Sequence, residues 1–125
     1  MDEARIEQLG AEAIANVLFD VKQPQSRDDL AVLMGRESLD YESSLFSYGI
    51  EVDLKDPTKY AFYLRQGGLG LPDRDYYLKS EFEKQKAAYQ TYATTLLKLV
   101  AWPEAEARAQ DVVDFETRIA EASWT

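Results

Sequence analysis

The stretch that divides the predicted strands from the helices after them reads Gln66-Gly67-Gly68-Leu69-Gly70-Leu71-Pro72-Asp73-Arg74-Asp75-Tyr76-Tyr77-Leu78. Three glycines in four positions favour irregular backbone and positive φ, so a strand that enters this stretch ends there. Pro72 suits the first turn of a helix, and Asp73 and Asp75 lie where the helix dipole favours negative charge. The stretch therefore predicts a turn followed by a short helix through Tyr77.

The residues before the glycines alternate in polarity. From Phe46 to Leu54 every second residue is apolar and those between are small or polar, which is the period of a half-buried strand. Residues 55–59 have turn composition, and residues 60–65 are aromatic-rich. We therefore expect one β-hairpin over about residues 46–66. Because an isolated hairpin is marginally stable in water, its apolar face must lie on helices of this chain or on another part of a larger protein.

Helical periodicity governs the N-terminal part of the chain. Apolar residues in the range 2–21 recur at three-and-four spacing and predict one helix, which Pro24 ends. Ser26 and Asp29 then resemble a capping box before a short second helix, with Gly35 expected as its C-terminal cap.

The C-terminal half is also expected to be helical. Residues 38–45 favour an extended or loosely helical connector, residues 80–101 a helix, and Pro103 the start of a last helix. The apolar side of that helix is predicted to comprise Ala105, Ala109, Val112, Val113, Phe115 and Ile119. The sequence thus predicts a mainly α fold, a single domain over residues 1–125 with about four to five helices and one β-hairpin.

Composition excludes several classes of function. The 125 residues carry a formal net charge of -9, which repels nucleic acid and anionic lipid surfaces. No segment approaches the length of apolar sequence that a bilayer span requires, and no secretory signal is visible at Met1–Ala4. Without cysteine there is neither a disulfide frame nor a thiolate nucleophile.

The absence of histidine is the most discriminating fact of composition. Catalytic zinc normally takes two or three imidazoles, and Ser-His-Asp or Cys-His catalysis needs one. We therefore predict no catalytic residue, no cofactor-binding residue and no metal ligand in this chain.

Other patterns favour structural roles. The glycine-rich stretch lacks the third glycine and the Gly-Lys-Ser/Thr ending of phosphate loops, and a calcium loop starting at Asp73 would have Leu78 and Lys84 at its sixth and twelfth positions. The paired acids Asp28/Asp29, Asp53/Asp56 and Glu81/Glu83 are expected to cap turns and helices. Core packing is favoured over a peptide-binding surface for Tyr60, Tyr63, Tyr76, Tyr77, Tyr89 and Tyr92.

Residues 50–60 and 66–78 resemble the non-catalytic region of neprilysin-like and endothelin-converting-enzyme-like zinc metallopeptidases. The stretch from Gln66 to Leu78 is the specific part, and residues 26–35 and 111–125 are also similar, so the resemblance covers nearly the whole chain. The family-like motif, expected to be structural, comprises Gln66, Gly67, Gly68, Leu69, Gly70, Leu71, Pro72, Asp73, Arg74, Tyr76 and Tyr77.

The resemblance implies a large, two-lobed, exported α-helical peptidase that uses zinc and has a cavity admitting peptides but not folded proteins. This chain would belong to the lobe that caps the cavity, with the catalytic lobe and the peptide substrate as its partners. The zinc ligands of the family lie C-terminal to the matching region. Because the chain ends at Ser123-Trp124-Thr125 without a polar tail, a fragment of a longer peptidase is favoured over a short relative.

Two other functions remain open. A free-standing α-helical domain could hold a peptide or protein through exposed aromatic residues. A carboxylate-dependent hydrolase would need two buried acids facing one cleft.

Overall fold

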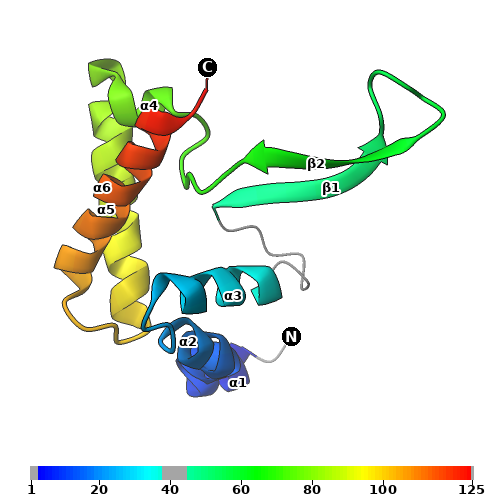
Figure 1. The fold of residues 1–125 in the computed structure, drawn as a ribbon. Helices are drawn as coiled ribbons and strands as arrows, with labels where there is room; N and C mark the ends of the chain where they lie inside the picture. Colours follow the sequence, from blue (N-terminus) through cyan, green and yellow to red (C-terminus); the bar gives the residue numbers. More distant parts are fainter. Residues whose placement is uncertain (1–2, 38–44, 125) are drawn as a thin grey trace. The chain divides into compact units, whose positions relative to one another are not determined.

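The computed structural model describes residues 3–37 and 45–124 (Figure 1). The chain forms two compact units, a first unit of residues 1–42 and a second unit of residues 43–125. The described elements are α1 (Glu3–Leu9), the 3₁₀ helix η1 (Gly10–Ile14), α2 (Ala15–Val21), α3 (Arg27–Glu37), β1 (Phe46–Val52), β2 (Tyr60–Gln66), α4 (Asp75–Leu78), the 3₁₀ helix η3 (Ser80–Phe82), α5 (Glu83–Leu99) and α6 (Ala105–Ala122). The predicted fold class, mainly α with one β-hairpin, is confirmed.

In the first unit, the predicted helix over residues 2–21 is divided. Gly10 has a φ of +51° and opens a 3₁₀ segment, after which α-helix resumes at Ala15. A positive φ costs glycine little because it has no Cβ. The continuous apolar stripe over these residues concealed the break. None of the described residues of this unit is buried.

The start of α3 has the predicted capping box. The Ser26 hydroxyl oxygen accepts from the Asp29 N–H at 3.1 Å, and the Asp29 carboxylate accepts from the Ser26 hydroxyl at 2.8 Å and from the Gln25 N–H at 3.1 Å. The bonds that the carboxylate accepts, the one from the Ser26 hydroxyl above all, lower the pKa of Asp29. The predicted cap at Gly35 is wrong, since α3 continues to Glu37.

The hairpin of the second unit has a regular antiparallel register from Phe46 opposite Gln66 to Val52 opposite Tyr60. One face carries Gln66 and seven apolar residues, which we call the apolar hairpin face: Phe46, Tyr48, Ile50, Val52, Tyr60, Phe62 and Leu64. All seven residues are exposed, and the half-buried residues of the strands lie on the opposite face, contrary to the prediction. Cover of the apolar side by another part of a larger protein stays a prediction. The hairpin extends away from α4, α5 and α6 (Figure 1).

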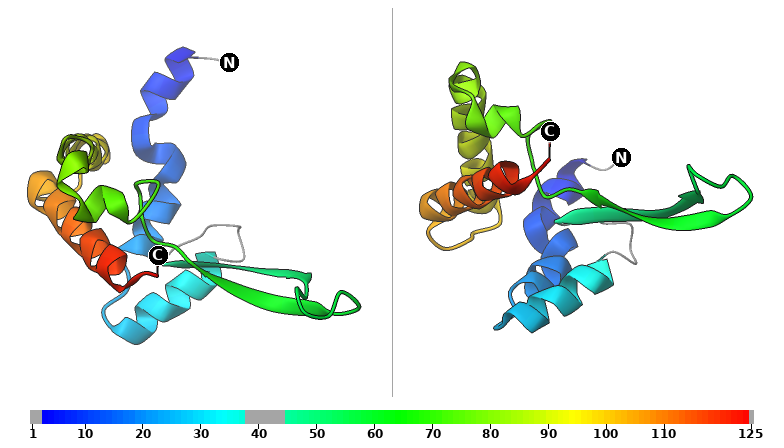
Figure 2. Two further views of the ribbon diagram at one scale, coloured as in Figure 1. Left: turned by 90° about the horizontal axis from the view of Figure 1, so that it is seen from above. Right: turned by 45° about the horizontal axis from the view of Figure 1, so that its top comes forward.

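Helices α4, α5 and α6 form the core of the second unit, and α5 packs along α6 (Figure 2). The buried residues are Tyr77, Ala105, Ala109, Val113 and Ala120. Four of these five belong to α6, where small side chains let a neighbouring helix approach closely. Val112 and Phe115, predicted on the same apolar side, are exposed instead.

Two further predictions concern the chain between elements. The last helix begins at Ala105 and not at Pro103, because Glu104 has a left-handed φ of +54° before it. The predicted connector over residues 38–45 lies outside the described residues except for Leu45. None of the described helices is long and apolar enough to cross a membrane.

Candidate functional site

The family-like motif joins the hairpin to the helical core. Gln66 is the last residue of β2, the glycines and Pro72 form the loop, and Tyr76 and Tyr77 lie on α4. Arg74 donates from Nε to the carbonyl oxygen of Ala120 at 3.0 Å. The Gln66 side-chain oxygen accepts from the backbone N–H of Trp124 at 2.7 Å. The motif is therefore fastened to the C-terminal end of α6 at two points.

A hydrogen-bonded group that we call the tyrosine cluster lies at the centre of this contact and comprises Tyr77, Tyr89 and Glu116. The Tyr77 hydroxyl donates to Glu116 Oε2 at 2.6 Å, and the Tyr89 hydroxyl donates to Glu116 Oε1 at 3.0 Å. The Tyr77 oxygen also accepts from the Leu71 N–H at 2.8 Å, which ties the glycine loop to the cluster. One carboxylate thus links α4, α5, α6 and the loop.

Burial and the bond to Glu116 both favour protonated tyrosines. Burial raises the pKa of Tyr77, and the hydrogen bond to Glu116 raises it further. The same two causes, in the same order, raise the pKa of Tyr89 to about 12. A neutral hydroxyl that donates to a carboxylate is a charge-assisted bond, which is stronger than a neutral one. The cluster is suited to holding structure and not to accepting protons.

The glycines of the motif are required by their surroundings. A Cβ on Gly70 would lie 2.5 Å from Cζ of Tyr89 and closer still to its hydroxyl. Gly68 has a φ of +80°, and a Cβ there would lie 3.0 Å from the Cα of Leu45. Side chains at these positions would displace the tyrosine cluster or strain the loop.

One aromatic contact and one hydrogen bond hold α4 against η3 and α5. Tyr76 stacks on Phe82 with ring centroids 4.3 Å apart, and the Lys86 ammonium donates to the Tyr77 carbonyl oxygen at 3.1 Å. Tyr77 is the buried tyrosine of the predicted set, whereas Tyr60 and Tyr92 are exposed. The prediction of core packing is therefore confirmed for Tyr77 and wrong for Tyr60 and Tyr92.

A pocket of about 290 Å³ lies beside the motif. Its lining comprises Gln66, Gly67, Leu69, Leu71, Pro72, Asp73, Arg74, Ser123 and Trp124. The polar groups at its edge are already engaged, since Arg74 and Gln66 bond to α6 and to Trp124, and the Asp73 carboxylate accepts from the Asp75 N–H at 2.9 Å. The pocket therefore results from the contacts that hold the motif against the C-terminal end of α6.

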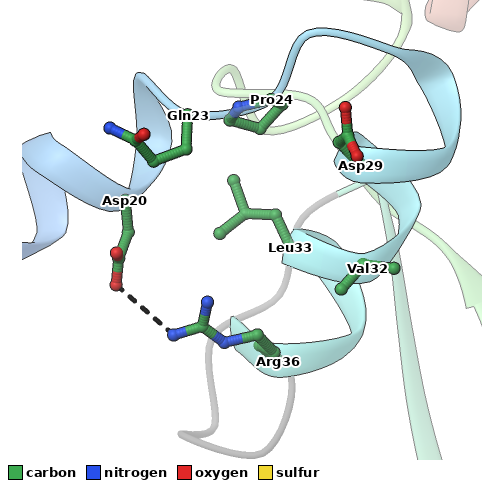
Figure 3. Close-up of a pocket in the computed structure, with 7 residues that line it drawn as sticks. All are labelled: Asp20, Gln23, Pro24, Asp29, Val32, Leu33 and Arg36. Carbon is green, nitrogen blue, oxygen red and sulfur yellow. Dashed lines mark hydrogen bonds and ion pairs between the residues drawn. The ribbon is translucent and has the colours of Figure 1, made fainter.

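A second pocket, of about 270 Å³, lies between α2 and α3 in the first unit (Figure 3). Arg36 approaches Asp20 at 3.5 Å across its mouth, and Leu33 points into it (Figure 3). Asp29, also in the lining, is engaged in the cap of α3. Its ionic groups thus already contact one another or the backbone.

The acids of the chain do not form a metal centre in residues 3–37 and 45–124, where no group of three or more His, Cys, Asp or Glu side chains could hold an ion. Asp53 accepts from the Lys55 N–H at 2.7 Å, and Asp56 accepts from the Thr58 hydroxyl at 2.6 Å, so both serve the hairpin turn as predicted. Catalytic zinc does not fit this donor set, because the sequence has no histidine and no cysteine.

Sequence reasoning identified the motif but missed Glu116. Glu116 continues the buried row of Ala109, Val113 and Ala120 on α6 at spacings of four, three and four residues. A charged residue in an otherwise apolar helical row was the available signal. Its partners Tyr77 and Tyr89 lie 39 and 27 residues away, so no local pattern joins them.

Comparison with known proteins decides which family has this architecture. The sequence model described as peptidase family M13 matches residues 1–125. The chain belongs to peptidase family M13. Human endothelin-converting enzyme 1 is 33% identical over 130 residues. That alignment covers 96% of this chain and 17% of the human protein. Mouse endothelin-converting enzyme-like 1 is 29% identical over 136 residues, with 98% and 18% covered.

Two solved structures of one zinc metalloprotease agree with this fold. Mycobacterium tuberculosis zinc metalloprotease Zmp1 in its open state superposes with a TM-score of 0.84 at 27% identity, over 98% of this chain and 20% of Zmp1. The inhibitor complex of Zmp1 gives a TM-score of 0.85 at 27% identity, over 98% and 19%. This M13 chain therefore spans less than a fifth of the length of the curated relatives named above.

Proposed function

We propose that this chain is a non-catalytic part of a larger zinc-dependent metallopeptidase that hydrolyses oligopeptides, and that it helps to shape the substrate cavity. The observation that carries the proposal is the M13 match over the whole of a chain that contains no histidine. Catalytic zinc is commonly held by imidazoles, so its ligands have to come from the rest of the parent protein.

The proposed partners are the catalytic lobe of the same peptidase and the peptide in its cavity. The length of the relatives supports the first partner, since the chain corresponds to 17% of endothelin-converting enzyme 1. The internal bonds of the family-like motif support a structural role for it, because Gln66, Arg74 and Tyr77 contact α6 or the chain just after it. We further propose that residues 1–125 act as one helical domain of the non-catalytic lobe.

Peptide cleavage by the full-length protein tests this proposal. We expect zinc-dependent cleavage of short peptides, loss of cleavage with a chelator and recovery when zinc is restored. A folded protein containing the same cleavable sequence should resist cleavage, whereas the unfolded form should not. The 125-residue chain with added zinc serves as the control and should be inactive. Cleavage by that chain, or chelator-resistant cleavage by the full-length protein, would contradict the proposal.

The exposed apolar hairpin face favours one alternative, a free-standing α-helical domain that holds a peptide or protein. The two proposals differ in the extent of the reading frame. A frame that continues to an H-E-x-x-H sequence supports the peptidase. A frame that ends near Thr125 supports the interaction domain.

A further inference from the structure

The apolar hairpin face is more open than the face behind it. Tyr60, Ile50 and Phe62 expose 77%, 73% and 61% of their surface, whereas Gly49 and Ala61 on the opposite face are half-buried. An antiparallel sheet with one wet side normally turns its polar side to water. In this hairpin the apolar side is also turned to water among the described residues.

The composition of the face is that of a contact surface. None of its seven residues is charged, although 30% of the chain is. Four of the seven are aromatic, and Tyr48 stacks on Phe62 across the strands with centroids 5.6 Å apart. Depletion of charge and enrichment in aromatic residues are typical of the centre of an interface.

The charges of the strands lie on the opposite face. Arg65 contacts both carboxylate oxygens of Glu51 at 2.6 Å, and its guanidinium lies 5.7 Å from the centre of the Tyr63 ring. That face has its polar groups paired with one another and is suited to water. The two faces therefore differ in chemistry as well as in exposure.

We propose that the apolar hairpin face packs against the remaining part of the same polypeptide, on an apolar surface which that part supplies. The inference rests on the proposed function, because the surface that it requires belongs to the rest of the longer parent protein. The length of the relatives supports this occupant, since about four-fifths of Zmp1 lies outside the match. A second copy of this chain is disfavoured as the occupant, because each copy carries a net charge of -9.

Cysteine labelling in the full-length protein tests the proposal. Ile50→Cys places a thiol on the apolar hairpin face, and Glu51→Cys places the matched control one residue away on the opposite face. Both positions belong to one tryptic peptide, residues 37–55, so one mass measurement reads both variants. Phe62→Cys provides a second probe of the same face from β2.

The measured quantity is the alkylation rate of each thiol in the native protein relative to the same protein in urea. We expect the native state to slow labelling at Ile50→Cys and Phe62→Cys at least about tenfold more than at Glu51→Cys, as burial under a packed surface requires. Equal slowing on both faces would overturn the proposal. Slowing that disappears on dilution would also overturn it, because a second copy would then be the occupant.

Peptide cleavage by the same samples is a separate readout. Active protein with an unprotected apolar hairpin face would contradict this inference and leave the proposed peptidase intact. Inactive protein with a protected face would contradict the proposed peptidase and support the packing of the hairpin.

Discussion

Helix α6 and the β1–β2 hairpin belong to the same compact unit, but α6 buries a row of apolar side chains and the hairpin exposes its own. The row of α6 that meets α4 and α5 is buried, uses small residues and satisfies its one carboxylate with two tyrosine hydroxyls. The hairpin leaves seven larger apolar residues exposed. The difference teaches that the buried row of α6 is covered within the second unit, whereas the hairpin leaves its apolar side open for the surface against which we propose that it packs.

The largest effect is expected from Glu116→Ala, which leaves the hydroxyls of Tyr77 and Tyr89 without their acceptor. Losing charge-assisted bonds at buried hydroxyls should lower the free energy of unfolding by about 3 kcal/mol. Denaturant unfolding of the 125-residue chain measures this. Glu116→Gln, which keeps an acceptor, should cost less, and equal stability of Glu116→Ala and the natural chain would show that the core does not depend on the cluster.

Gly70→Ala should be the next most damaging change. Its Cβ collides with the Tyr89 ring and hydroxyl, and overpacking of this kind costs about 2 kcal/mol. Gly35→Ala is the matched control, because a Cβ there meets no atom within 4 Å. In the interior of α3 that change should stabilise the helix by about 0.5 to 1 kcal/mol. Similar results for the two variants in thermal unfolding would argue against a tight glycine loop.

Alkaline pH should weaken the core through the tyrosine cluster. The pKa values of Tyr77 and Tyr89 are raised on folding, that of Tyr89 to about 12, so their contribution is full below about pH 10 and is lost as the pH rises towards 12. The unfolded chain ionises first in that range and is thereby favoured. Tyr89→Phe should flatten the decline in the unfolding midpoint between about pH 10 and about pH 12. An unchanged slope would contradict this role.

The smallest effect is expected on the hairpin. Ile50→Thr combined with Phe62→Thr should change the stability of the 125-residue chain by no more than about 0.5 kcal/mol, because both side chains are already exposed and threonine suits strands. The same pair in the full-length protein should be clearly destabilising. Equally small effects in the 125-residue chain and in the full-length protein would contradict the proposed difference between hairpin and core.

The hairpin and the first helical cap could be predicted because their signals are local. Strict alternation fixed the strands to residues 46–66, and the Ser26–Asp29 pair marked the start of α3. The exposure of the apolar hairpin face could not be predicted, because alternation reports which residues share a face but not what covers it. The periodicity of residues 2–21 likewise concealed the 3₁₀ segment at Gly10.

The tyrosine cluster, in contrast, could not be predicted from local sequence signals. Tyr77 and Tyr89 were expected to pack in a core, but nothing local indicates that both hydroxyls converge on Glu116. The same holds for α6, where the buried row turned out to be alanine-rich while Val112 and Phe115 face solvent. Which of two adjacent helical faces is buried depends on the partner helix and not on hydrophobicity alone.

Hydrogen exchange of the 125-residue chain beside that of the full-length protein tests the central claim most directly. We predict that the amides of α6 around Val113 exchange slowly in both, and that the amides of β1 and β2 exchange at least about a hundredfold more slowly in the full-length protein than in the chain alone. Hairpin amides with the same protection in both proteins would contradict the account.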